Sequence, residues 1–204
     1  MESNEIEVIK VHRIDLCSLI KFKMQPKLIV RTDQNQAELG NEVKRFIEQV
    51  ISTLLSMDCK LLFKDLIGSP QAAQKDIVRR FQNDLLTNLN TGITVNESVW
   101  AVEVKAHLDY RDSYDLSLEK IMDGIKYIII IELDKNRADQ VAKKFLSRIS
   151  HTIDCPTVYF AFCYPGTEKM NLSECKKYFH YFSNITNKMS SKETPKVFVG
   201  ITTE

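Results

Sequence analysis

The chain has 204 residues, of which 44% are hydrophobic and 27% are charged, and its formal net charge is +1. This size and composition predict one compact domain with its own core. No run of residues approaches the roughly 20 apolar residues of a membrane span, and the start MESNEIEVIK lacks the basic and apolar regions of a signal peptide. We therefore expect a cytoplasmic protein with no membrane segment, and the near-neutral charge by itself favours neither nucleic acid nor an acidic partner.

The cysteines and histidines exclude several kinds of site. The five cysteines contain no C-x-x-C spacing, and the four histidines contain no pair at i, i+4. Both facts argue against a disulfide framework, a zinc clip and a histidine metal site. We expect reduced thiols that are mostly buried.

The first half of the chain predicts two strands followed by two helices. Alternating residues at 5–14 indicate a strand, with 27–32 as its partner. Apolar residues then recur at intervals of three and four over 36–57, which predicts a helix. The same period over 71–89 predicts a second helix, which Gly92 closes.

The second half of the chain is rich in strands. Period-two alternation over 97–110 and 112–120 predicts two half-buried strands. A hairpin signal at 122–124 leads into YIIIIELD, which is apolar on both faces and therefore central in a sheet. The remaining predicted elements are a helix over 136–151, a strand over 155–165, a helix over 172–189 and a strand over 196–203.

Acidic residues stand at two points in this order of elements. A helix precedes a three-strand meander that has Asp115 in its middle strand, within RDSYDLSLEK. Glu132, within IIIIELDK, follows 17 positions later at the end of the third strand, and a crossover helix leads to a fourth strand. In these respects residues 36–165 resemble the PD-(D/E)XK nuclease superfamily, with Asp115 as its first aspartate and Glu132 as its second acid.

The resemblance implies an α/β protein with a restriction-endonuclease-like core, in which helices flank a mixed central sheet. We expect 1–204 to form a single domain of this kind, with 1–35 as an N-terminal strand appendage and 36–90 as an N-terminal helical part. The implied activity is hydrolysis of phosphodiester bonds in DNA by a restriction or defence enzyme. Its expected cofactor is Mg²⁺ or Mn²⁺, and a homodimer would match a two-strand target.

Three carboxylates are the candidate metal ligands. Side chains alternate along a strand, so Glu132 and Asp134 share a face, and Asp115 lies on the neighbouring strand. Hard divalent cations prefer such oxygen ligands, and the main-chain carbonyl of Leu133 is a further candidate. Glu42, in the first long helix, matches a glutamate that some family members add to the metal site. The alternative is that the acids only mark the solvent end of a buried strand.

The lysine of the family motif is displaced in this sequence. The family places it two positions after the second acid, where Asp134 stands, and Lys135 follows one position later. Alternation predicts that Lys135 points away from the acids, so it is a catalytic candidate only if a bulge turns it inward. Glu103-Val-Lys105 is a literal E-x-K, but no aspartate stands in a preceding strand, and we interpret it as a polar strand face.

A polar stripe follows on the next predicted helix. The spacing of three, four and four residues places on one side of this helix Arg137, Gln140, Lys144 and Arg148. Basic and amide side chains beside an acidic metal site can hold a nucleic-acid backbone, so these four are the candidate DNA contacts. In several branches of the family a glutamine of this helix lies near the catalytic centre, which favours Gln140. The alternative is an ordinary solvated helix face.

Two classes of function remain open. The three acids favour an active endonuclease, whereas the displaced lysine favours a nuclease-like domain that has lost catalysis and binds nucleic acid or protein. An RNA endonuclease is a third alternative.

Overall fold

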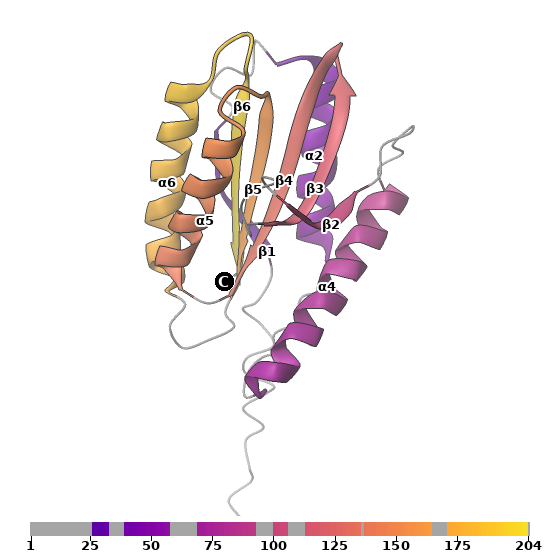
Figure 1. Ribbon diagram of the computed structural model, residues 1–204, viewed down its shortest axis with the longest axis vertical. Helices are drawn as coiled ribbons and strands as arrows, with labels where there is room; N and C mark the ends of the chain where they lie inside the picture. Colours follow the sequence, from indigo (N-terminus) through magenta and orange to yellow (C-terminus); the bar gives the residue numbers. More distant parts are fainter. Residues whose placement is uncertain are drawn as a thin grey trace, which may run out of the picture.

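The computed structural model describes residues 26–32, 39–57, 69–92, 100–105, 113–135, 137–164 and 171–203. In this part of the chain, helices flank a six-stranded mixed sheet, so the protein is of the α/β class (Figure 1). The strand predicted at 5–14 lies outside the described residues.

The sheet combines an antiparallel meander with a parallel half. Its strand order is β1-β6-β5-β4-β3-β2. Antiparallel pairs join β2 to β3, β3 to β4 and β1 to β6, whereas β4, β5 and β6 are parallel. In chain order the six strands are Pro26–Thr32, Ala101–Lys105, Ser113–Met122, Ile125–Asp134, Thr157–Cys163 and Lys196–Thr203. The predicted three-strand meander is confirmed. Within the described residues, the strand that pairs with β1 is β6.

The strand β4 lies inside the sheet, between β3 and β5. Ile129 and Ile131 face one hydrophobic cluster and Ile130 faces the other, and all three side chains are fully buried. Each such burial stabilises the fold by about 1.5–3 kcal/mol. The central place that the apolar run predicts is therefore confirmed.

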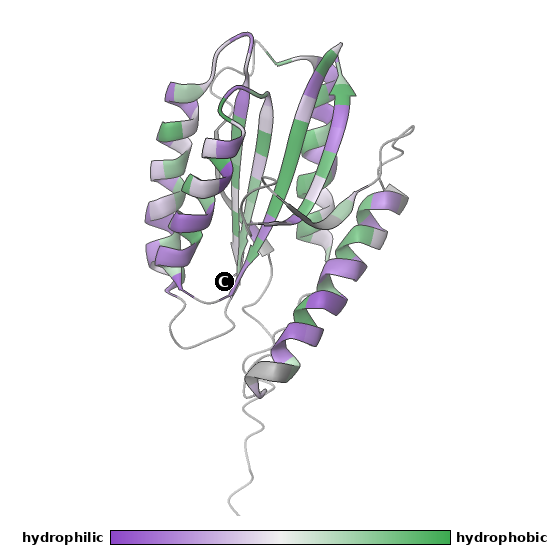
Figure 2. Cartoon of the chain, in the orientation of Figure 1, coloured by the Kyte–Doolittle hydropathy of each residue, from purple (hydrophilic) through white to green (hydrophobic). Residues whose placement is uncertain are grey.

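Each face of the sheet is covered by two helices. On one face lie α2 (Asn41–Ser56) and α4 (Gln71–Gly92), and on the other lie α5 (Ala138–His151) and α6 (Leu172–Met189) (Figure 1). Hydrophobic residues concentrate along the strands, whereas much of the outer surface of α5 and α6 is hydrophilic (Figure 2). Within the described residues, no helix combines the length and the apolar character needed to cross a membrane.

The turn between β3 and β4 also holds the start of α2. Asp123 and Gly124 have φ angles of 48° and 78°, which suit a two-residue hairpin turn. The Asp123 carboxylate accepts hydrogen bonds from the backbone N–H groups of Glu42 at 3.1 Å and Val43 at 3.3 Å. The Glu42 carboxylate in turn accepts one from the N–H of Asp123 at 2.7 Å. Because Gly40, the residue before α2, has no side chain to cap the helix, the turn supplies this cap.

Replacing Asp123 should destabilise the protein through the loss of this cap. Asp123→Gly is expected to lower the free energy of unfolding by about 1–2 kcal/mol, because two helix N–H groups lose their acceptor. Glycine tolerates the positive φ angle, so the change removes the carboxylate without straining the turn. Urea denaturation measures the effect, and Asp123→Asn, which keeps one acceptor oxygen, should lose less. Equal stability of Asp123→Gly and the wild type would contradict the cap.

Candidate functional site

Three carboxylates meet where β3 begins and β4 ends. Asp115 lies near the start of β3, and Glu132 and Asp134 lie two residues apart near the end of β4. The β3–β4 ladder ends at Leu116, and beyond it the carboxylate of Asp115 bridges the two strands. Its Oδ2 atom accepts the backbone N–H of Leu133 at 2.8 Å, which fixes Asp115 beside the end of β4.

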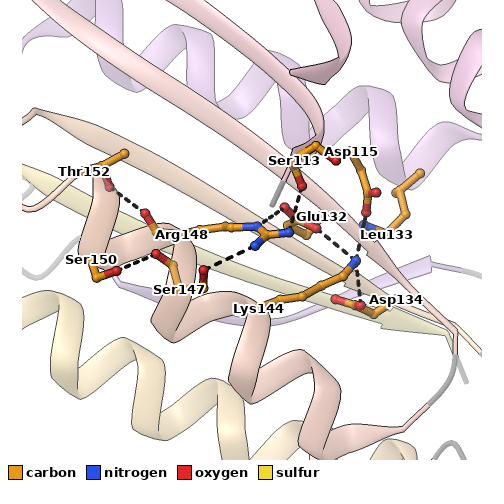
Figure 3. Close-up of polar contacts among 10 residues, drawn as sticks. All are labelled: Ser113, Asp115, Glu132, Leu133, Asp134, Lys144, Ser147, Arg148, Ser150 and Thr152. Atoms are coloured by element: carbon orange, nitrogen blue, oxygen red, sulfur yellow. Dashed lines mark hydrogen bonds and ion pairs between the residues drawn. The ribbon is translucent and has the colours of Figure 1, made fainter. Parts of the chain in front are cut away.

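The three carboxylates converge on one ammonium group, which Lys144 of α5 supplies (Figure 3). Its Nζ atom lies 3.1 Å from Oδ2 of Asp115 and 3.0 Å from the nearest oxygens of Glu132 and Asp134. The structure therefore brings the three predicted acids together. It also places Lys144 at their centre rather than on a solvent-facing stripe.

Arg148, one turn further along α5, holds Glu132 from the other side (Figure 3). Its Nε atom donates to Oε1 of Glu132 at 3.0 Å, and a terminal nitrogen donates to the carbonyl of Ser113 at 2.7 Å. The side chain of Arg148 is 7% exposed and that of Glu132 is 0% exposed. The prediction that Arg148 contacts DNA is therefore corrected, because its guanidinium is buried where it fixes Glu132 and joins α5 to β3.

Burial controls the protonation of these side chains. It raises the pKa of Glu132 to about 8, because the loss of water outweighs the charges of Lys144 and Arg148. Burial likewise raises the pKa of Asp134. Burial lowers the pKa of Lys144, but the neighbouring carboxylates outweigh this effect and hold it well above its usual value. The ammonium therefore stays charged at neutral pH, and Glu132 and Asp134 retain protons more readily than ordinary carboxyls do.

The donor set suits a hard divalent cation. Carboxylate oxygens are the ligands that Mg²⁺ and Mn²⁺ prefer. Within the described residues, Oδ2 of Asp134 is buried and has no hydrogen-bond partner. Oε2 of Glu132 is also buried; it forms an ion pair with Lys144 at 3.0 Å but accepts no hydrogen bond in the described part of the chain. Both oxygens therefore retain the capacity to accept a further partner. No group of three His, Cys, Asp or Glu side chains in this part of the chain is arranged as a ready metal site, and Lys144 stands at the point the acids share.

Lys135 does not join the acids. Its Nζ atom donates a hydrogen bond to Oε1 of Gln74 at 3.2 Å. Gln74 belongs to α4, which covers the face of the sheet opposite to α5. The alternation along β4 predicts this direction, and no bulge in the described strand reverses it. Arg137 and Gln140 are exposed at the start of α5, where Arg137 pairs with Asp139 at 2.7 Å. These two remain available to a partner in solvent.

The structure corrects the prediction for Glu42. Its carboxylate binds the turn at Asp123, at the end of the β3–β4 hairpin opposite to Glu132. Strand residues rise by about 3.3 Å each, so the stretch from Ile125 to Glu132 separates the two places by roughly 20 Å. By contrast, the main chain of Leu133 does reach the site, because its N–H binds Asp115. The carbonyl of a strand residue points to the same side as its N–H, so Leu133 remains a candidate ligand.

Sequence reasoning missed the central place of Lys144, although a signal for it was present. Val141, Phe145 and Ile149 form the buried side of α5. Lys144 and Arg148 fall within the same three-and-four spacing, so they lie next to this apolar side rather than opposite to it. A basic residue in that position, beside a strand that ends in acids, indicates an internal ion pair.

The arrangement can therefore present three carboxylate oxygens to a cation, with one ammonium and one guanidinium beside them. No family model matches the chain, and no curated protein matches its sequence.

Proposed function

We propose that the chain is a metal-dependent endonuclease of restriction-endonuclease-like fold, which hydrolyses phosphodiester bonds in DNA. Its setting would be a cytoplasmic restriction or defence system, in which it acts as a homodimer. The observation that carries the proposal is the convergence of Asp115, Glu132 and Asp134 on one point. The antiparallel meander β2-β3-β4, followed by α5 and the parallel strand β5, supports it, because the resemblance rests on this order of elements.

The side chains of the site have distinct roles in this proposal. The three carboxylates and the carbonyl of Leu133 would hold Mg²⁺ or Mn²⁺, which when bound supplies Lewis-acid polarisation of the phosphodiester. Arg148 orients Glu132 through the 3.0 Å hydrogen bond from its Nε atom. Arg137 and Gln140, exposed at the start of α5, would contact the phosphates that flank the reacting one.

A second candidate function is a nuclease-like domain without catalysis that binds nucleic acid or protein. The observation that favours it is the contact of Lys144 with all three acids. A charged cluster that is satisfied from within the chain can stabilise a fold without any metal. An endonuclease that acts on RNA is a third candidate, and it shares the same site.

Cleavage assays on the purified protein test the proposal. The substrates are double- and single-stranded DNA and the corresponding RNA, each with Mg²⁺ or Mn²⁺. We expect cleavage of DNA that EDTA stops and that added metal restores. Cleavage of RNA alone would select the third candidate. Binding of nucleic acid without cleavage of any substrate would select the interaction domain and contradict the endonuclease.

A further inference from the structure

Lys144 and a divalent cation would compete for one place. The Nζ atom lies 3.0–3.1 Å from one oxygen of each of the three acids. Metal–oxygen distances in Mg²⁺ and Ca²⁺ sites are about 2.0–2.6 Å, so a cation bound by the same oxygens would stand where the ammonium now stands. Two positive centres cannot share this point, because their repulsion is strong in a poorly solvated site.

Lys144 is the member of the cluster that can leave. Its side chain is 30% exposed, whereas those of Glu132 and Asp134 are 0% and 7% exposed. A long lysine stem can carry the ammonium towards solvent while its methylene groups stay on the protein surface. Arg148 lacks this freedom, because its side chain is 7% exposed and it also holds the carbonyl of Ser113.

We propose that Lys144 is a displaceable counter-ion: its ammonium pairs with the three acids in the metal-free protein, and a divalent cation must expel it to bind. This inference rests on the proposed function, because it concerns the same metal site. Because the backbone of Lys144 stays in α5, the displaced ammonium can move only as far as its side chain reaches. It therefore remains close to the acids, where it can contact a phosphate oxygen of the substrate. Before metal binds, Lys144 provides the three acids with a positively charged partner. When metal binds, the displaced ammonium of Lys144 becomes available to the nucleic acid.

Metal binding by the Lys144→Met variant tests the displacement without any cleavage assay. Methionine keeps an unbranched side chain of similar length but removes the charge. Isothermal titration with Mn²⁺, and with Ca²⁺ in parallel, should show at least about tenfold tighter binding than the wild type, which corresponds to about 1.4 kcal/mol. The matched control is Lys143→Met, on the same helix, whose side chain is 69% exposed and pairs only with Asp139 among the contacts described. Its metal affinity should equal that of the wild type.

A second measurement uses the wild-type protein, so it does not depend on the folding of a variant. Lysines are labelled with an amine-reactive reagent, with and without saturating Ca²⁺, and quantified by mass spectrometry. We expect labelling of Lys144 to rise several-fold with Ca²⁺, because the ammonium leaves the carboxylates, whereas labelling of Lys143 stays constant. Unchanged or reduced labelling of Lys144 in protein that has bound Ca²⁺ would overturn the inference.

The outcomes separate this inference from the proposed function. Metal binding that Glu132→Gln abolishes but Lys144→Met leaves unchanged or weakens would overturn the displacement and keep the metal site. Metal binding that appears only in Lys144→Met would mean that the ammonium blocks the site and is not displaced, which would overturn the inference and identify the wild type as a metal-free domain. If neither the wild type nor Lys144→Met binds Mn²⁺ or Ca²⁺, both proposals fail.

Discussion

Asp115→Asn is expected to slow the proposed metal-dependent DNA cleavage by at least about a hundredfold while the protein stays folded. The change replaces a charged oxygen of the proposed metal site by a neutral amide. Such a loss removes several kcal/mol of charge stabilisation in the transition state, and each 1.4 kcal/mol corresponds to about tenfold in rate. Single-turnover kinetics with saturating Mg²⁺ measure the effect. The amide oxygen of asparagine can still accept the N–H of Leu133, so the end of β4 should keep its place.

A matched variant on the same strand controls for the loss of an acid. Glu119→Gln removes a carboxylate of β3 that is 60% exposed and pairs with Lys126. This residue lies close to the turn, away from the acids, so cleavage should be unchanged. DNA binding should be largely retained in both variants. Wild-type cleavage by Asp115→Asn would remove Asp115 from the site, and an equal loss in Glu119→Gln would mean that the effect is not specific to the cluster.

Arg148→Met is expected to lower the free energy of unfolding by about 3–5 kcal/mol, which is the usual effect of removing one partner from a buried ion pair. The change leaves the fully buried Glu132 without the donor on its Oε1 atom. It also deprives the carbonyl of Ser113 of its 2.7 Å hydrogen bond. Urea denaturation at about pH 9, where Glu132 with its pKa of about 8 is ionised, and with no divalent cation present, measures the difference.

Two further variants show whether the unpaired acid causes this loss. Lys143→Met removes an exposed charge from the same helix and should change stability by less than about 0.5 kcal/mol. Arg148→Met combined with Glu132→Leu removes both buried partners, and it should be more stable than Arg148→Met alone. If the double variant is no more stable, Glu132 is not the group that Arg148 stabilises.

The fold was predictable where the sequence pattern is local and strong. The apolar run of β4 predicts a central strand because such residues must be buried on both faces. The helical period over Leu172–Met189 predicts α6 with the bounds that the structure shows. The proximity of Asp115 to Glu132 follows from the same reasoning, because a meander places consecutive strands side by side.

Other features depend on contacts between distant segments, which no local pattern contains. Glu42 binds a turn 81 residues later in the chain, so its role as part of a helix cap is invisible in the helix itself. The pairing of β1 with β6 joins the two ends of the described chain. The inward direction of Lys144 and Arg148 depends on how α5 is rotated over the sheet. Charged side chains are normally exposed to solvent, and burial of these two is favourable only because the acids lie beneath the helix.

The central claim is that the three carboxylates form a divalent metal site, and anomalous scattering from Mn²⁺-soaked crystals tests it most directly. We predict one anomalous peak at about 2.0–2.6 Å from carboxylate oxygens of Asp115, Glu132 and Asp134, with the Nζ atom of Lys144 moved away from them. The contradicting result is the absence of a peak there at saturating Mn²⁺, with the ammonium of Lys144 still in contact with all three acids.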